Sequence, residues 1–114
     1  MVHRINFDGS SKPGITPDHL RNCLLYLYQT GYQPVSLEDL FSALNNQTQL
    51  PEKAAVFTMD DGYIDQALIA APIFIELDCP VTFFVITDMI DQTMWPWDAQ
   101  VSWIINHTKK HHWK

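Results

Sequence analysis

Residues 54–62 read AAVFTMDDG, a mostly apolar run that ends in two acids and a glycine. The run from Ala54 to Met59 shows no alternation of apolar and polar residues, which predicts a strand covered on both faces. Gly62 breaks the run. The adjacent acids Asp60 and Asp61 therefore fall at the carboxyl end of a buried strand, which is where parallel α/β folds bind their ligands.

Further strand patterns lie on both sides of this run. Residues 2–5 and 33–35 read as short strands upstream, and residues 80–86 form a run of β-branched and aromatic side chains downstream. Helical patterns separate these segments, and alternating strands and helices are typical of parallel βαβ units. We therefore expect residues 2–5, 33–35, 54–59 and 80–86 to form adjacent parallel strands with helices on one side.

The predicted helices have clear local signals. Thr16 and Ser36 can each cap a helix start, and Gly31 can end the first helix in a left-handed conformation. The segment 63–77 is apolar and helical in pattern, with Pro72 marking a kink or boundary. The second helix is expected to bury a stripe of large apolar side chains, namely Leu37, Leu40, Phe41 and Leu44.

Composition limits the classes of function. The chain has 114 residues and a net charge of -6, which argues against general nucleic-acid binding and against docking on anionic membranes. No apolar run reaches the roughly 20 residues of a membrane span, and the first residues lack a secretory signal pattern. These features leave the compartment undetermined. Cys23 and Cys79 read as two separately buried thiols, not as a disulfide.

The paired acids indicate chemistry at the end of the strand. Two adjacent, partly desolvated carboxylates repel each other, and a divalent cation would relieve that repulsion. One carboxylate could then bind the metal while its neighbour acts as a base. The alternative is that Asp60 or Asp61 caps the following helix, although one acid is sufficient for a cap.

Four segments together resemble the polysaccharide deacetylases (carbohydrate esterase family four). Residues 57–63, FTMDDGY, are similar to the family's Thr-Phe-Asp-Asp-Gly motif, with Met59 in place of the usual Phe. Val-His-Arg at 2–4 resembles its Tyr-His-Arg opening strand. GYQPVSL at 31–37 and PVTFFV at 80–85 resemble its second strand and its Ala-Thr-Phe-Phe-Val strand. The likeness extends from residue 2 to about residue 92 and keeps the family's order.

The resemblance implies an α/β fold, the N-terminal part of a deformed (β/α) TIM-like barrel with parallel strands. It implies one partial domain over residues 1–114, since a complete barrel needs roughly 200 residues or more. It also implies a metal-dependent hydrolase that removes N-acetyl groups from an amino-sugar polymer. By resemblance, Asp60 is the general base and Asp61 is a ligand of the metal, commonly zinc, which two histidines of a later His-Ser/Thr-x-x-His motif complete.

Residues 107–111 match the letters of that histidine motif. His107 and His111 are four residues apart, so on a helix or around a tight turn they could share one metal ion with Asp61. The alternative is a solvated, basic helix end, in which the histidines and lysines of this segment offset the helix dipole. The sequence leaves both interpretations open.

The family's later motifs have no counterpart before Lys114, so we expect a truncated chain without useful activity of its own. A partial barrel leaves sheet edges unpaired, which favours self-association. A non-catalytic fragment that functions only by assembly is therefore an alternative. Another is a Mg-binding phosphoryl-transfer domain, but that class requires a Lys after a later strand, and none lies between Lys53 and Lys109.

Overall fold

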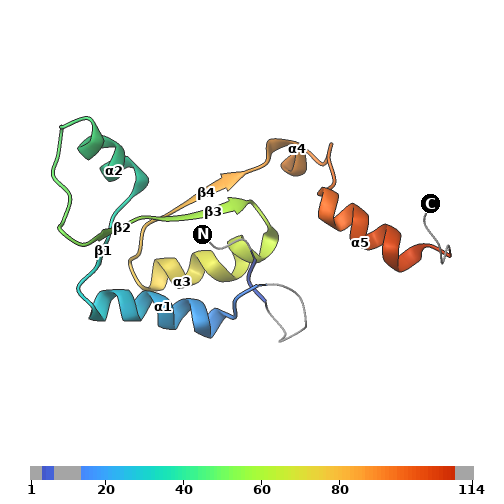
Figure 1. Ribbon diagram of the computed structural model, residues 1–114, viewed down its shortest axis with the longest axis horizontal. Helices are drawn as coiled ribbons and strands as arrows, with labels where there is room; N and C mark the ends of the chain where they lie inside the picture. Colours follow the sequence, from blue (N-terminus) through green and yellow to red (C-terminus); the bar gives the residue numbers. More distant parts are fainter. Residues whose placement is uncertain (1–3, 7–13, 110–114) are drawn as a thin grey trace.

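The computed structural model describes residues 4–6 and 14–109 of the chain. In these ranges helices and short strands alternate (Figure 1), in the order α1 (Pro17–Gln29), β1 (Gln33–Pro34), α2 (Leu37–Leu44), β2 (Ala54–Ala55), β3 (Phe57–Asp61), the π-helix η1 (Gln66–Ala70), α3 (Ala71–Glu76), β4 (Val81–Val85), α4 (Thr87–Ile90) and α5 (Trp97–His107).

The strands are parallel but form two pairs instead of one sheet. β1 pairs with β2, and β3 pairs with β4, with Phe57 opposite Val81 and Asp61 opposite Val85. The expectation of four adjacent strands is therefore wrong for the described residues. The extended run that begins at Ala54 pairs first with β1 and, beyond Val56, with β4. β1 stays short because Pro34 lacks an N–H donor and helix α2 starts three residues later.

The predicted first strand is reduced to a single bridge. Ile5 pairs in parallel with Ile15, and Asn6 donates a backbone hydrogen bond of 2.8 Å to the carbonyl of Ile15. Residues 2 and 3 lie outside the described residues. A parallel α/β arrangement is thus present, and closure into a barrel is not seen in the described part of the chain.

The core lies between the β3–β4 pair and the helices α1 and α3, which lie together on one side of it (Figure 1). Met59 supplies the centre of β3, and the rings of Phe57 and Phe74 meet at 5.6 Å between centroids. The fully or nearly buried apolar residues are Ile5, Leu20, Leu24, Met59, Ala70, Ile73, Phe74 and Cys79.

Two burial expectations are wrong. Cys79 is buried as expected, but Cys23 is exposed, and it lines an open hollow beside the core residues Leu20 and Leu24. On α2, Phe41 and Leu44 are 66% and 71% exposed, since no described element covers that face of the helix.

Local signals placed the helix starts correctly. The Thr16 hydroxyl accepts a hydrogen bond from the His19 N–H at 3.1 Å, and Ser36 forms a reciprocal capping box with Asp39. Pro72 follows the π-helix η1, in which the Ala71 N–H bonds to the Gln66 carbonyl, five residues back. The wider turn fits the missing N–H of Pro72.

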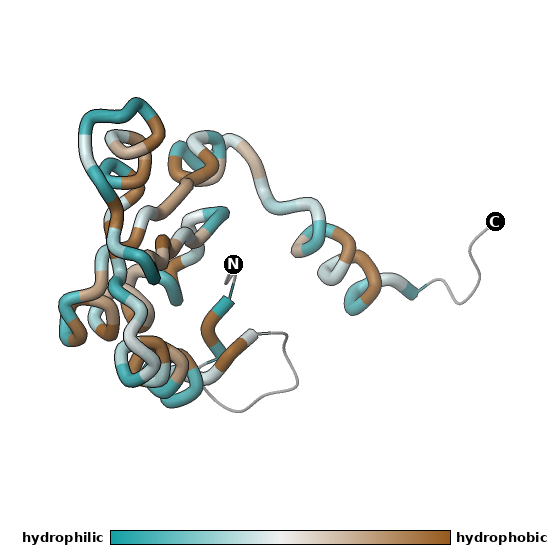
Figure 2. Tube along the Cα trace, turned by 60° about the vertical axis from the view of Figure 1, so that its left-hand side comes forward, coloured by the Kyte–Doolittle hydropathy of each residue, from teal (hydrophilic) through white to brown (hydrophobic). Residues whose placement is uncertain are grey.

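Helix α5 stands apart from the packed body, although hydrophobic residues occur along it (Figures 1 and 2). Its large apolar side chains are exposed: Trp97, Val101, Trp103, Ile104 and Ile105. Within residues 4–6 and 14–109, no helix combines the length and apolar character that crossing a membrane requires.

Candidate active site

The two acids lie where the sequence predicted them, as the last two residues of β3. Asp60 is opposite Phe84 and Asp61 is opposite Val85 in the parallel register with β4. Both acids are half-buried. The strand therefore delivers a pair of carboxylates to its carboxyl end, next to the turn that leads into the following helix.

That turn is unusual in its backbone conformation. Asp61 has φ +79° and Gly62 has φ +75°, so two consecutive residues are left-handed. A side chain on Gly62 would place its Cβ 2.9 Å from Cγ1 of Val85, which only glycine avoids. Asp tolerates a positive φ better than most residues, but the conformation still costs free energy, and such residues cluster at functional sites. The turn also takes the Asp61 side chain out of the regular strand alternation.

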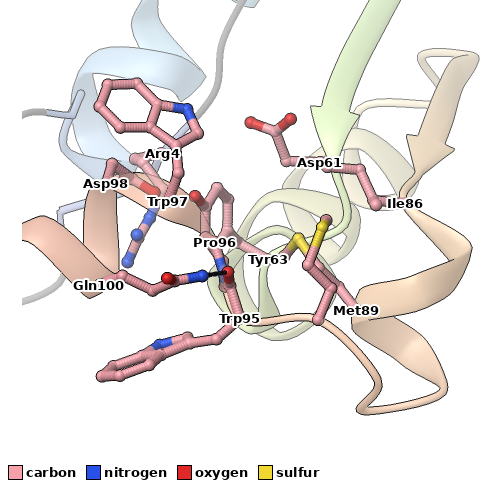
Figure 3. A pocket seen from close by; sticks show the side chains of 11 residues that line it. Arg4, Asp61, Tyr63, Ile86, Met89, Trp95, Pro96, Trp97, Asp98 and Gln100 are labelled. Carbon is pink, nitrogen blue, oxygen red and sulfur yellow. Dashed lines mark hydrogen bonds between the residues drawn. The ribbon is translucent and has the colours of Figure 1, made fainter.

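Asp61 lines a cavity of about 400 Å³ at this corner (Figure 3). Tyr63 and Arg4 form part of its wall, and residues of the segment that enters α5 form another part. The remaining lining residues are Ile86, Met89, Met94, Trp95, Pro96, Trp97, Asp98 and Gln100. Asp60 does not line this cavity; its backbone carbonyl instead accepts a hydrogen bond from the Gln66 side chain.

Charges of both signs act on Tyr63 inside this cavity. Burial raises the pKa of the Tyr63 hydroxyl, and the negative charges of Asp98 and Asp61 raise it further. Arg4 opposes this effect, because its guanidinium carbon lies 4.1 Å from the centroid of the Tyr63 ring. Tyr63 therefore stays protonated at neutral pH and presents a neutral hydroxyl beside two carboxylates.

Arg4 is held in position by a buried acid. Oδ2 of Asp65 accepts the backbone N–H of Ile5 at 2.6 Å and Nε of Arg4 at 3.3 Å. Asp65 is 9% exposed, so this contact is shielded from water on the carboxylate side. The N-terminal segment is thereby fixed to the helical segment that follows the Asp-Asp-Gly turn, and Arg4 is directed over Tyr63.

The sequence did not reveal these supporting residues. Arg4 and Asp65 are 61 positions apart, and no local pattern connects them. Trp97 and Asp98 belong to a Trp-Pro-Trp-Asp segment that is conspicuous in the sequence, and that aromatic density was the available signal. Their place beside Asp61 depends on how the chain turns after β4.

His107 lies elsewhere. It is the last residue of α5, at the end of that helix farther from β3 (Figure 1). Its ring stacks on Trp103 with 4.5 Å between centroids, and its Nδ1 lies 2.8 Å from the Trp103 carbonyl oxygen. The structure does not bring His107 to Asp61, and His111 lies outside the described residues. The ligand set of Asp61, His107 and His111 stays a prediction.

The described residues also contain no group of side chains that is already arranged to bind a metal ion. Among residues 4–6 and 14–109, no three His, Cys, Asp or Glu side chains gather closely enough to hold a metal ion. The cavity itself offers two carboxylates, Asp61 and Asp98, whereas catalytic zinc sites use about three protein ligands. The described part of the chain therefore does not by itself fit a complete metal centre.

The chain is similar in sequence to proteins of known function. No protein-family model matches the chain. The poly-β-1,6-N-acetyl-D-glucosamine N-deacetylase of Escherichia coli K12 is 35% identical to it over 82 residues, and the protein of that name from E. coli O157:H7 matches equally. The match covers 72% of this chain but 12% of the relative, so the chain spans about an eighth of the length of these curated relatives.

Solved structures of deacetylases also resemble the chain in fold. A de-N-acetylase from Aggregatibacter actinomycetemcomitans superposes with a TM-score of 0.72 and 27% identity, covering 79% of this chain and 37% of that one. The Streptococcus pyogenes deacetylase PplD, solved with acetate, gives 0.69 and 27%, covering 79% and 42%. IcaB from Ammonifex degensii gives 0.64 and 28%, covering 71% and 35%. With the Asp-Asp-Gly turn at the end of β3, these likenesses support the identification of the chain as similar, in sequence and in fold, to a fragment of the polysaccharide deacetylases.

Proposed function

We propose that this chain supplies part of the active site of a carbohydrate N-deacetylase that acts on an N-acetylated amino-sugar polymer. The observation that carries the proposal is the strained Asp61–Gly62 turn, which sets Asp61 into a cavity at the carboxyl end of β3. The E. coli relatives are named for activity on poly-β-1,6-N-acetyl-D-glucosamine, and a polymer of that class is the substrate we assign.

In this proposal Asp60 is the general base and takes a proton from the water that attacks the amide carbonyl. The backbone carbonyl of Asp60 accepts a hydrogen bond from the Gln66 side chain. This bond restricts the end of the strand that carries the Asp60 carboxylate. Departure of the sugar amine needs a proton donor as well, and general acid–base groups typically contribute 10²–10⁴-fold each. Tyr63 is the neutral hydroxyl that the described cavity offers, but its raised pKa makes it a weak acid.

Asp61 is the residue we assign to a divalent metal, zinc by resemblance. When bound, such a metal would polarise the amide carbonyl and lower the pKa of water. His107 and His111 are the further ligands that the sequence predicts. Zinc titration of the chain and of its His107→Ala and His111→Ala variants tests this assignment. Loss of stoichiometric binding in either variant supports it, and binding that survives both replacements removes the two histidines from the site.

We also propose that β1–β4 are part of a TIM-like barrel and that the 114 residues alone have no useful activity. The parallel strand pairs support the first statement, and the proportion of the solved deacetylases that the chain matches, 35–42%, supports both. The test is acetate release from an N-acetylglucosamine oligomer with zinc supplied. Release well above background, lost in Asp60→Asn, would show instead that the chain is a working enzyme by itself.

A second candidate is a non-catalytic role in which the chain functions by assembly with itself. β4 has one described strand neighbour, and Phe84 and Val85 on it are about half exposed, as are several apolar residues of α5. Exposed strands and apolar patches of this kind favour association. Light scattering after size exclusion should then show dimers or larger species, and a monomer across the micromolar range would contradict self-association.

A further inference from the structure

Two tryptophans stand beside the Asp61 cavity without being packed into the protein. Trp97, the first residue of α5, is 77% exposed, and Trp95 is 50% exposed. Both line the cavity (Figure 3), in which the Trp97 indole and the Asp61 carboxylate lie on either side of Tyr63. An indole that stays in water forgoes the large stabilisation of burial, whereas at binding sites tryptophan is among the residues that contribute most.

The segment that carries Trp97 is held by its own backbone. Pro96 has φ -51° and ψ 135°, and its carbonyl accepts the Gln100 N–H at 2.9 Å as the first hydrogen bond of α5. The Gln100 side chain also donates to the Trp95 carbonyl. The Trp97 ring is therefore presented from a defined turn, which lowers the entropy lost when a ligand binds.

Trp97 borders a second hollow as well. This hollow, of about 380 Å³, runs along α5 and is lined by Trp97, Asp98, Val101, Ser102, Ile105 and Asn106. The two hollows share Trp97 and Asp98, and each has a volume within the roughly 300–1,000 Å³ typical of small-molecule sites. A surface with two adjoining depressions and a shared indole suits a chain of linked rings better than a single small ligand.

The charges around the indole select among ring-shaped ligands. Asp61 and Asp98 are acidic, and the chain carries a net charge of -6, so a phosphate-linked polymer would be repelled. A pyranose is uncharged; its C–H face can lie on an indole, while its hydroxyl and amide groups can reach carboxylates, the Gln100 amide and the Arg4 guanidinium. A sugar polymer therefore fits both the ring surface and the polar rim.

We propose that Trp97 is a specificity-determining residue on which a pyranose ring of the N-acetylated polymer stacks, next to the ring presented to Asp61. The proposal rests on the proposed function for the class of polymer. It adds that the substrate crosses from the Asp61 cavity to the hollow along α5, with Trp97 between the two.

The experiment is calorimetric or NMR titration of the 114-residue chain with β-1,6-linked N-acetylglucosamine pentamer and with the monosaccharide. Trp97→Ala and Trp97→Phe are compared with Phe41→Ala, a control because Phe41 is also an exposed aromatic residue but lies on α2 and lines neither hollow. We expect the pentamer to bind more tightly than the monosaccharide. Trp97→Ala should weaken pentamer binding about tenfold or more, Trp97→Phe should retain most of the binding, and Phe41→Ala should leave the binding unchanged.

Each of the other possible results overturns the stacking role, the subsite or the amino-sugar class of the ligand. Equal pentamer binding by the wild type and Trp97→Ala, with circular dichroism unchanged, overturns the stacking role but leaves the proposed function intact. No binding by the wild type at millimolar pentamer overturns the subsite. Equal affinity for a β-linked glucose oligomer, still lost in Trp97→Ala, would keep Trp97 as a pyranose platform and instead remove the amino-sugar class that the proposed function supplies.

Discussion

At the scale of single residues, the candidate active-site corner depends on a glycine whose replacement is expected to cost free energy. Gly62 combines a left-handed φ of +75° with a close approach to Val85. Gly31 has a similar φ of +82°, but an added Cβ there would meet only Nζ of Lys53, at 4.0 Å. The two positions therefore separate the cost of the backbone conformation from the cost of the steric clash.

Replacing Gly62 by Ala is expected to lower the free energy of unfolding by about 2–3 kcal/mol, because left-handed strain of about 1–2 kcal/mol adds to the contact with Val85. Gly31→Ala, with strain alone, should cost about 1–2 kcal/mol. Urea unfolding of both variants and the wild type measures the difference. Equal costs at the two positions would mean that the turn after β3 has room that the structure does not show.

The two thiols should respond differently to pH. Burial raises the pKa of the Cys79 thiol to about 11, and the nearby Asp78 charge acts in the same direction, while a hydrogen bond with Tyr28 opposes it. An unfolded Cys ionises near 8.5. The raised folded pKa therefore contributes stability that is complete below about pH 8.5 and is lost as pH rises toward 11.

The thermal midpoint of the wild type should accordingly fall more between pH 8 and pH 10 than that of Cys79→Ala, which lacks this ionisation. Maleimide should label the exposed Cys23 quickly at pH 8 and Cys79 only after unfolding. Parallel decline of the two midpoints, or rapid labelling of Cys79 in the folded chain, would show that this thiol is not buried in the protein.

At the scale of elements, the structure shows which secondary-structure predictions depended only on neighbouring residues in the sequence. The capping residues Thr16 and Ser36 predicted the starts of α1 and α2 because a cap needs only the next three residues. The division of the run from Ala54 to Asp61 between two partners was not predictable, since pairing is decided by segments far along the chain. The exposed face of Phe41 and Leu44 was missed because periodicity indicates a buried face only where another element covers it.

The capping box of α2 gives a test at this scale. Ser36 accepts the Asp39 N–H at 3.0 Å, and its hydrogen bonds to the Asp39 carboxylate lower the pKa of that acid. Ser36→Ala should destabilise α2 by about 1 kcal/mol, seen as roughly fivefold faster amide exchange in residues 37–44. Ser42→Ala, inside the same helix, is the control and should leave exchange unchanged or slower. Similar exchange in both variants would remove the cap as the determinant of this helix start.

At the scale of the whole molecule, one acidic corner draws on three separate parts of the chain. Arg4 reaches it through Asp65, Asp61 comes from β3, and Trp97 and Asp98 come from the start of α5. The sequence predicted that the two acids stand at the end of a strand, because an apolar run ends there in Asp-Asp-Gly. It could not identify Arg4 or Trp97 as neighbours of Asp61, because their approach depends on the turns between elements and not on any local pattern.

The most direct test of the Asp60–Asp61 assignment is a transplant into the E. coli poly-β-1,6-N-acetyl-D-glucosamine N-deacetylase, in which the 82 aligned residues are replaced by those of this chain. Acetate release from the polymer should persist in the transplant. Asp60→Asn should reduce it about 10²–10⁴-fold, and Asp61→Asn should reduce it comparably, while the exposed-residue control Glu52→Gln should have no effect. A transplant that unfolds cooperatively yet releases no acetate, or releases it equally with and without Asp60, would contradict the assignment.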